Sequence, residues 1–409
     1  MKIVQINHFS YKAAGGIMVN IHQSLLKEGE DSYIVWGRGR RAENKREYYM
    51  EDSMGVRWHA FYTRMTDRTG FASRSATKKL VQWLEGINPD IIHLHCVHGY
   101  YVNLEVLFNY IRKNHIKVVW TQHDCWSFTG HCAYFDAIGC TKWETGCYEC
   151  QQLKTYPKAY VDNSKTNWLT KKKIFSGLDI VIVTPCNWLK RLISQSFLAD
   201  YPCRVIYNGI NTNVFHHTLS NFKNENGLEK YCLILGVASE WTERKGLKDF
   251  IRLDSMIDHN RYKIVIIGLN KHQIKIVPKT IFAMERTSNV KELVEIYSAS
   301  DVYLNLTYED NFPTTNLEAA ACGTKVITYK TGGAPEAIKD GCGYVVEKGD
   351  LEAVFELLPQ LCGEAKDKLL VDSYKESCYF SCDRMVDEYL SLYKELGGIA
   401  NECAYKTTD

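Results

Sequence analysis

Short apolar runs alternate with helical patterns along the first half of the chain. The runs cover residues 2–8, 32–36, 90–95, 117–123, 179–185 and 203–209. They are almost continuously apolar, which is typical of strands buried on both faces of a parallel sheet. Segments of helical spacing, such as 103–114 and 187–197, separate them. The pattern predicts a doubly wound α/β domain over residues 1–215.

The same alternation restarts after a polar interruption. Residues 216–230 have no apolar periodicity and predict a linker. Further apolar runs at 231–239, 262–269, 301–308, 324–329 and 343–347 predict a second α/β domain over 231–381. Residues 382–398 carry apolar side chains at helical spacing and end in Gly-Gly, so we expect a C-terminal helix that packs back on the N-terminal domain. Two domains also suit a chain of 409 residues.

Composition narrows the class of protein. Fifty Lys and Arg face 48 Asp and Glu, so the net charge of +2 gives no reason to expect a nucleic-acid partner. The first residues enter a predicted strand without a signal peptide or membrane span, which predicts a cytoplasmic protein. In that compartment the 15 cysteines are expected to be reduced thiols, some of them metal-bound.

The stretch EDNFPTTNLEAAACG carries two carboxylates at the end of a predicted strand. Asp310 falls in a turn and Glu318 about one turn inside a helix, which Thr314 or Thr315 suits as an N-cap and Gly323 as a left-handed C-cap. Ligands of open α/β sheets bind at this end of the strands. Spacing alone leaves three possibilities open. Asp310 caps the helix and Glu318 is solvated, or the two acids cleave a bond, or they hold a ligand.

Two further loops of this half suit a phosphate. In SEWTERKGLKDF, Arg244 offers a bidentate contact and Lys245 a point charge. Gly246, and the pair Gly332 and Gly333 in YKTGGAPEA, allow backbone amides to approach an oxyanion. An isolated Arg-Lys-Gly is a weak signal, but two such loops beside the carboxylates favour a phosphate-bearing ligand.

Together these loops resemble the nucleotide-sugar half of glycosyltransferase family 4, whose members have the GT-B fold of two Rossmann-like domains with a cleft between them. The family motif E-x-F-G-x-x-x-x-E-A-x-A-x-G-x-P-V is matched here by DNFPTTNLEAAACGTKV. Asp310 replaces the first Glu, one methylene shorter, and Lys325 replaces the usual Pro. The family's Arg, five residues before its phosphate-binding Lys, falls on Glu240, so Arg244 is the candidate substitute. The resemblance extends over the whole chain, including VIYNGINTNVF at the domain junction.

The resemblance implies retaining transfer of a sugar from a nucleoside-diphosphate donor to a hydroxyl group. Glu318 would bind the ribose and Asp310 would bind the transferred sugar. Lys245 and Arg244 would stabilise the leaving diphosphate. The donor-side backbone would come from Asn311, Phe312, Pro313 and Thr314. No Asp-x-Asp pair occurs, so we expect no metal or other cofactor for catalysis.

The N-terminal half contributes two further candidates. Gly15 and Gly16 open a predicted helix, either as a tight turn or, as the resemblance favours, as a loop near the donor phosphates. His123 ends a predicted strand, and the resemblance implies that it orients the donor sugar and acceptor, with general-base help as an option.

Four cysteines cluster in the long loop 125–155. Cys132, Cys140, Cys147 and Cys150 have the spacing C-x7-C-x6-C-x2-C and are candidate ligands of a structural zinc, with His131 as an alternative ligand. Free thiols in a loop are the simpler alternative.

Basic stretches at 37–46, 68–80 and 165–173 interleave with Phe71, Trp83 and Trp168. Most such stretches are solvated, but the aromatic residues allow a peripheral contact with an anionic membrane at the inner face of the cell membrane, which suits a lipid-linked or glycan acceptor.

The resemblance is strongest to bacterial enzymes of exopolysaccharide, capsule or lipopolysaccharide synthesis. The alternatives are a glycoside hydrolase or phosphorylase, and a non-catalytic module that binds nucleotide sugars or carbohydrate.

Overall fold

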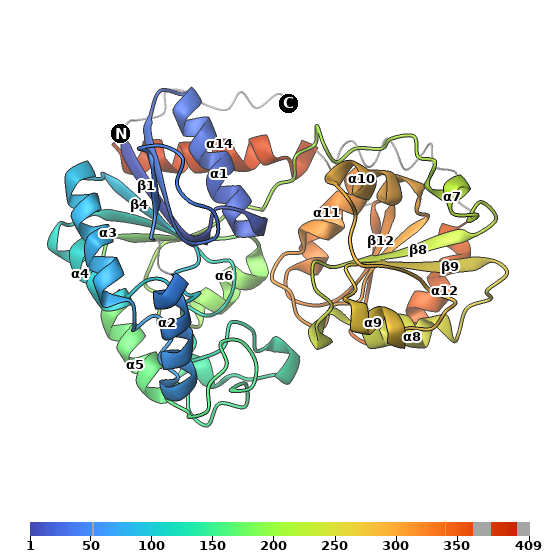
Figure 1. Cartoon of the computed structure of the whole chain (residues 1–409), viewed down its shortest axis with the longest axis horizontal. Helices are drawn as coiled ribbons and strands as arrows, with labels where there is room; N and C mark the ends of the chain where they lie inside the picture. The colour runs from blue at the N-terminus through green and yellow to red at the C-terminus, as the bar shows by residue number, and fades with distance from the viewer. Residues whose placement is uncertain (51–52, 340, 363–377, 399–409) are drawn as a thin grey trace. The chain divides into compact units, whose positions relative to one another are not determined.

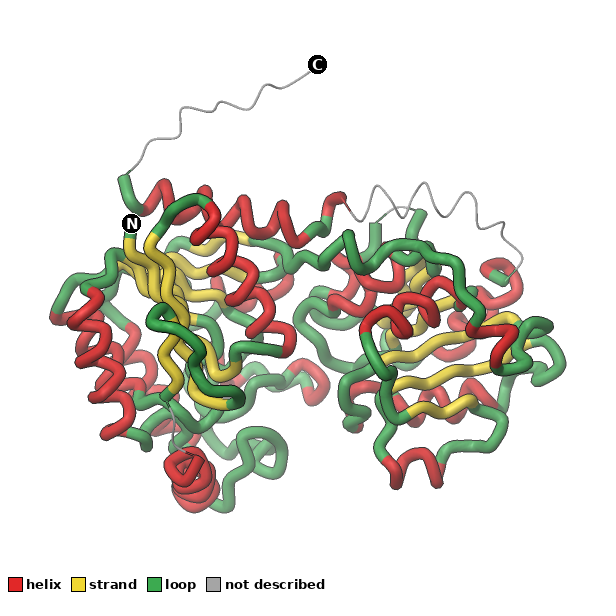
Figure 2. The backbone as a smooth tube through the Cα atoms, turned by 45° about the horizontal axis from the view of Figure 1, so that its top comes forward, coloured by secondary structure: helices red, strands yellow, loops and turns green. Residues whose placement is uncertain are grey.

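A computed structural model describes residues 1–50, 53–339, 341–362 and 378–398. The chain divides into two compact units, one of Met1–Tyr207 with the segment from Val386 onward, and one of Asn208–Met385 (Figure 1). Each unit contains a parallel β-sheet with helices packed against it (Figure 2). The α/β character predicted from the apolar runs is therefore confirmed.

The first unit has a seven-stranded sheet of order β3-β2-β1-β4-β5-β6-β7. Its strands are β1 Lys2–Phe9, β2 Asp31–Arg38, β3 Glu47–Tyr49, β4 Ile91–Leu94, β5 Lys117–Thr121, β6 Ile180–Thr184 and β7 Cys203–Val205. Its helices are α1 Lys12–Lys27, α2 Ser53–Thr66, α3 Arg74–Ile87, α4 Leu104–Lys113, α5 Ser164–Phe175 and α6 Asn187–Ser194. Every predicted strand of this half is present. The edge strand β3 was not predicted, because its three residues are too few to show a period.

The C-terminal helix α14, Cys382–Leu396, packs on the first unit. The hydroxyl of Tyr393 lies 2.6 Å from Nδ1 of His93 on β4, and that of Tyr389 lies 2.9 Å from the hydroxyl of Thr121 on β5. Both tyrosines are almost completely buried. Helix α14 therefore covers the middle of the first sheet.

The second unit has a six-stranded sheet of order β10-β9-β8-β11-β12-β13. Its strands are β8 Cys232–Val237, β9 Tyr262–Ile267, β10 Phe282–Met284, β11 Val302–Asn305, β12 Lys325–Tyr329 and β13 Gly343–Val346. Its helices are α7 Phe222–Glu225, α8 Leu247–Asp254, α9 Lys271–Ile276, α10 Val290–Ala299, α11 Thr314–Ala321 and α12 Leu351–Leu361.

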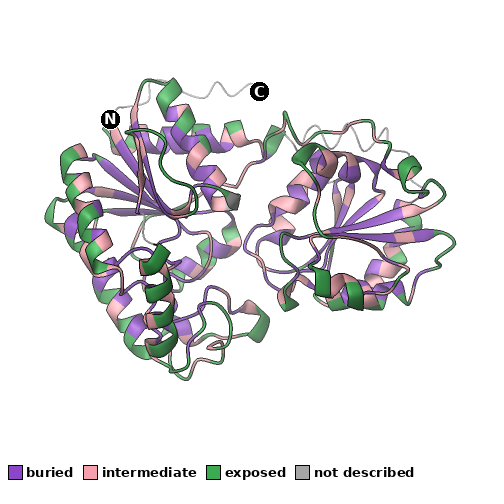
Figure 3. Cartoon of the chain, in the orientation of Figure 1, coloured by how far each residue is buried: buried purple, intermediate pink, exposed green. Residues whose placement is uncertain are grey.

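Alternate residues of these strands face two separate cores. Ile264 and Ile266 of β9 join one cluster with residues of α8 and α12, while Val265 and Ile267 join another with residues of α10 and α11. The central strands are buried on both faces, as Figure 3 shows in purple. This double coverage explains why the strands read as continuous apolar runs rather than as alternating ones.

Two expectations differ from the structure. Residues 216–230 do not form a free linker, since Phe222 and Leu228 pack in the core of the second unit and the division falls between Tyr207 and Asn208. Cys232 and Cys362 form a disulfide where reduced thiols were expected. They lie 130 residues apart, and only the packing of α12 near β8 brings them together.

No helix among the described residues is both long and apolar enough to cross a membrane.

Candidate active site

Asp310 is the meeting point of the loops that sequence analysis assigned to the donor. Nζ of Lys245 lies 2.6 Å from Oδ2 of Asp310, and Nη1 of Arg244 lies 3.9 Å from the same oxygen. Arg244 also donates to the carbonyl of Glu309 at 2.7 Å. Burial alone would raise the pKa of Asp310, but the two cations outweigh it and hold the pKa below its usual value. The carboxylate is thus ionised and paired.

Glycines let these loops approach closely. Gly246 has φ of +75°, and a Cβ there would lie 2.0 Å from the carbonyl oxygen of Leu306. Gly332 has φ of +56°, and its Cβ would lie 1.7 Å from the carbonyl oxygen of Asp310. The amide of Gly333 donates to the carbonyl of Asn311 at 3.0 Å. Both glycine loops therefore pack directly on the segment that follows β11 and carries Asp310.

Glu318 lies on the second turn of α11. Burial raises its pKa to about 7, with the hydroxyl of Tyr297 donating to Oε2 at 3.2 Å and Thr314 also hydrogen bonded to the carboxyl. The predicted threonine cap is wrong, because Pro313 is the N-cap and no side chain caps the helix. The left-handed stop is confirmed, with Gly323 at φ of +76°.

The side chains between the two acids are mostly buried. Asn311 and Phe312 are about 95% inaccessible, and the ring of Phe312 packs against Phe380 at a centroid distance of 5.8 Å. Pro313 is buried as well. These residues shape the loop, so a ligand would meet their backbone rather than their side chains.

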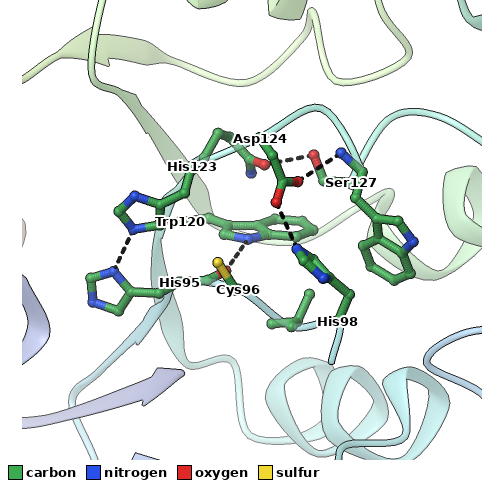
Figure 4. Close-up of a pocket in the computed structure, with 10 residues that line it drawn as sticks. His95, Cys96, His98, Trp120, His123, Asp124 and Ser127 are labelled. Atoms are coloured by element: carbon green, nitrogen blue, oxygen red, sulfur yellow. Dashed lines mark hydrogen bonds and ion pairs between the residues drawn. The ribbon is translucent and has the colours of Figure 1, made fainter. Parts of the chain in front are cut away.

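A polar cluster gathers at the carboxyl ends of three neighbouring strands in the first unit (Figure 4). His8 belongs to β1, His95 and His98 follow β4, and His123 and Asp124 follow β5. The His95, His98, His123 and Asp124 side chains line one small pocket with Trp120 and Ser127. Sequence analysis identified His123 but missed Asp124 and the other histidines, whose neighbourhood depends on strand order.

The hydrogen bonds of His95 define the protonation of His123. The amide nitrogen of Gln5 donates to the carbonyl of Met18 at 3.1 Å, so its oxygen accepts from Nε2 of His95 at 3.3 Å. Nδ1 of His95 then accepts from Nε2 of His123 at 3.0 Å. Burial lowers the pKa of His123 to about 4. His123 is therefore neutral at pH 7, with Nδ1 as a hydrogen-bond acceptor.

Asp124 forms a buried pair with His98. Its Oδ2 lies 2.7 Å from Nε2 of His98, whose Nδ1 lies 2.9 Å from the hydroxyl of Tyr156. The ligand atoms of Cys96, His98 and Asp124 come within 4.8 Å of one another, close enough to suit a metal ion. However, both nitrogens of His98 already have hydrogen-bond partners, so the group is satisfied without an ion.

The two glycines of α1 differ. A Cβ on Gly15 would lie 2.7 Å from the carbonyl oxygen of Phe9, whereas a Cβ on Gly16 would meet nothing within 4 Å. Gly15 thus allows the helix to start directly against the end of β1, and Gly16 has no such packing requirement.

The four candidate zinc ligands lie around one pocket. Cys132, Cys140, Cys147 and Cys150 line it together with His131. The Cys132 thiol is hydrogen bonded to the sulfur of Cys150, and the sulfur of Cys147 accepts the amide of Gly130 at 3.0 Å. In this ligand-free structure, no three of these ligand atoms come within 4.8 Å of one another. The structure gathers the cysteines that the spacing predicted, and metal binding stays a prediction.

Two family models match the chain, one for each half. Residues 17–214 match Glycosyltransferase Family 4, and residues 220–369 match Glycosyl transferases group 1. The chain is 24% identical to the putative colanic acid biosynthesis glycosyl transferase WcaC of Escherichia coli K12, over 97% of this chain and all of that protein. It is 25% identical to the capsular polysaccharide biosynthesis glycosyltransferase CapM of Staphylococcus aureus, over 48% of this chain and 55% of that one.

Solved structures share the fold at low sequence identity. Sucrose-phosphate synthase of Thermosynechococcus elongatus superposes with a TM-score of 0.69 at 14% identity, covering 98% of this chain and all of that one. Anabaena HepE in complex with UDP-glucose gives a TM-score of 0.63 at 13% identity, covering 97% and 100%. These matches confirm the predicted GT-B fold.

Proposed function

Because the chain belongs to the family 4 and group 1 glycosyltransferases, we propose that it transfers a sugar from a nucleoside-diphosphate donor to a hydroxyl of a growing bacterial cell-surface polysaccharide. The observation that carries the proposal is the convergence of Lys245, Arg244 and the glycine loops on Asp310. The E. coli and S. aureus relatives, named for colanic acid and capsule synthesis, support the polysaccharide class. The matches favour neither a hydrolase or phosphorylase nor a non-catalytic binding module.

On the donor side, the diphosphate would bind to Lys245 and Arg244 and to the amides of the glycine loops. Negative charge grows on this group as the sugar leaves, so fixed cations stabilise the transition state more than the ground state. Glu318 would accept hydrogen bonds from the two ribose hydroxyls. Asp310 would accept hydrogen bonds from hydroxyls of the transferred sugar. UDP-glucose in HepE supports a nucleotide sugar as the donor class.

The proposal also includes His123, which would form a hydrogen bond with a sugar hydroxyl. A pKa of about 4 makes the imidazole a weak base at neutral pH. We therefore assign it an orienting role. The leaving phosphate would take the acceptor proton, which permits same-face attack and retention of configuration without a covalent carboxylate intermediate.

Catalysis would need no metal ion, because Lys245 and Arg244 supply the positive charge. The test is a panel of nucleotide sugars read by thermal stabilisation and by release of nucleoside diphosphate in the presence and absence of EDTA. We expect one donor class to stabilise the protein and to turn over equally well with the chelator. Proton NMR of the product is expected to show the anomeric configuration of the donor.

Lys248→Ala is the matched control for the phosphate assignment. Lys248 lies three residues beyond Lys245 but is exposed and pairs with the equally exposed Glu243. If Lys245→Ala and Lys248→Ala release nucleoside diphosphate equally fast, the phosphate assignment is wrong. Stabilisation by a nucleotide sugar with no transfer to any acceptor would instead favour a binding module.

Contact with the inner face of the membrane is part of the proposal, through different residues from those first expected. Phe71 and Trp168 are at least 92% inaccessible, so they cannot enter a bilayer. Helix α2 instead exposes Met54, Trp58, Phe61 and Met65 at helical spacing, with exposed Arg57 and Arg64 beside them. Such a face suits an anionic lipid surface, where a lipid-linked acceptor would reside.

Vesicle sedimentation tests this contact. Vesicles containing anionic lipid are expected to retain the full chain at low salt and to lose it after Trp58→Glu with Phe61→Glu. The control Leu169→Glu also replaces an exposed apolar residue, but on helix α5. Equal retention of the α2 variant and the parent protein would exclude α2 as the contact.

A further inference from the structure

The cysteine-rich loop has little regular structure to hold it. Between β5 and α5 it forms only two short 3₁₀ turns among its described residues, Asp136–Ile138 and Lys142–Glu144. Its packing includes Trp143, whose carbonyl accepts from the indole of Trp168 at 2.9 Å. A loop of this length without secondary structure is uncommon in a compact domain, unless a bound ligand or a cross-link stabilises it or it has a function.

His131 points to a ligand beside the cysteines. Its imidazole is fully buried, and Nδ1 is hydrogen bonded to the buried carboxylate of Asp67. Because Nδ1 donates to Asp67, Nε2 carries a lone pair, and this nitrogen is buried without a hydrogen-bond partner. Leaving a buried polar atom without a hydrogen-bond partner is destabilising. A carboxylate behind an imidazole is also the arrangement that orients histidines toward zinc.

Three of the four cysteines around this pocket have hydrogen bonds to their sulfur atoms. Cys132 is hydrogen bonded to Cys150, whose sulfur also accepts the amide of Gln152, and Cys147 accepts the amide of Gly130 at 3.0 Å. Backbone N–H groups directed at sulfur stabilise thiolates, the form that binds metal. Cys140 interacts with Cys147 electrostatically, and its carbonyl accepts from the indole of Trp143 at 2.9 Å.

We propose that the loop binds one structural zinc ion through Nε2 of His131 and the sulfurs of Cys132, Cys147 and Cys150, with Cys140 outside the coordination sphere. Three thiolates and one imidazole form a closed tetrahedral set that selects zinc over hard cations. The ligand atoms would move closer together on binding, because no three of them lie within 4.8 Å of one another. This set replaces Cys140 of the four-cysteine prediction with His131.

The site is distinct from the proposed transferase chemistry. Its ligands surround the loop pocket, whereas Cys96, His98 and Asp124 line the separate pocket at the strand ends. Zinc would join the start of the loop, at His131 and Cys132, to its far end at Cys147 and Cys150. The expected role is to order the loop against α5.

Metal analysis and zinc-edge X-ray absorption of the purified full chain test the proposal. We expect one zinc per chain, with three sulfurs at about 2.3 Å and one nitrogen at about 2.0 Å. A first shell of four sulfurs would overturn it in favour of the four-cysteine set. Protein purified without zinc that gains neither metal nor thermal stability from added zinc would also overturn it.

Substitutions separate the ligands from their neighbours. His131→Ala and Cys147→Ser are expected to lose stoichiometric zinc, while Cys140→Ser, the matched control from the same loop, keeps it. Asp67→Asn is expected to keep zinc with about 10–100-fold lower affinity, measured by competition with a chelator. Should Cys140→Ser lose zinc while a folded His131→Ala retains it, the proposed ligand set is wrong. The absorption spectrum of the parent protein decides the case if a variant fails to fold.

Discussion

Glu318 allows the donor assignment to be tested by pH. Its pKa of about 7 in the ligand-free protein means that the carboxyl is half protonated at neutral pH. If both oxygens accept ribose hydroxyls, only the ionised form binds well. The apparent Kd then scales as one plus the ratio of protonated to ionised Glu318. We expect donor binding to weaken about tenfold between pH 8 and pH 6, or about 1.4 kcal/mol.

Isothermal titration with a nucleotide sugar identified in the donor panel measures this effect. The diphosphate of a nucleotide sugar does not ionise in this range, and the pKa of His123, about 4, keeps that residue neutral throughout. At pH 7 the heat measured in buffers of different ionisation enthalpy is expected to show release of about half a proton. Glu318→Gln removes the pH dependence. A flat profile in the parent protein, or an unchanged slope in the variant, would refute the reasoning.

The same carboxyl affects stability in a defined direction. A folded-state pKa raised above the usual value of 4.5 means that the folded protein binds the proton more tightly than the unfolded chain. The contribution of Glu318 to stability is therefore fully present below pH 4.5 and is lost as pH rises through about 7. Glu318→Gln is expected to gain about 3 kcal/mol over the parent at pH 8 in denaturant unfolding, and little at pH 4.

Four further substitutions test the rest of the site. Lys245→Ala is expected to lower kcat by about 100-fold, roughly 3 kcal/mol, in a nucleoside-diphosphate release assay, and normal turnover would contradict the phosphate role. His123→Ala is expected to slow turnover roughly tenfold with unchanged nucleotide affinity, because one neutral hydrogen bond is lost; loss of nucleotide binding alone would exclude the orienting role. Gly332→Ala places an alanine at a left-handed φ, with its Cβ against the carbonyl of Asp310. The free energy of unfolding is expected to fall by at least about 1 kcal/mol, measured by thermal unfolding. An unchanged melting temperature would contradict the packing. Asp310→Asn is expected to bind nucleoside diphosphate more tightly but to turn over more slowly, as kinetics and titration together would show; weaker binding would contradict the pairing.

The fold could be predicted because its strands are buried on both faces. A sheet covered on both sides forces near-continuous apolar runs, and these identified every strand longer than three residues. Two of the short edge strands, β3 and β10, have only half-buried residues and gave no signal. Phe222 and Leu228 were hidden for a related reason, since two isolated apolar residues in a polar segment show no period.

Candidate site residues could be predicted where they lie in one local motif. They could not be predicted where residues from several strands come together. Asp310, Lys245 and Glu318 each lie in a local motif, so the sequence alone identified them as candidates. The pairing of His98 with Asp124, and the support of His123 by His95, depend on β4 lying beside β5. Nothing in the sequence states that adjacency. The same holds for Asp67, which lies 64 residues from His131.

Asp310 pairs with two cations, and its side chain is one methylene shorter than the Glu of the family motif. Lys245 and Arg244 both face one oxygen of this carboxylate, so the trio carries a net charge of +1 before the donor arrives. A diphosphate that binds the cations must therefore share them with Asp310 rather than meet them unpaired. The carboxylate lies 2.6 Å from Nζ of Lys245, where it orients the ammonium group. Under the proposed function, Asp310 would contact the donor sugar and Lys245 the diphosphate. Because the two residues form one pair, a substitution of either is expected to change both contacts.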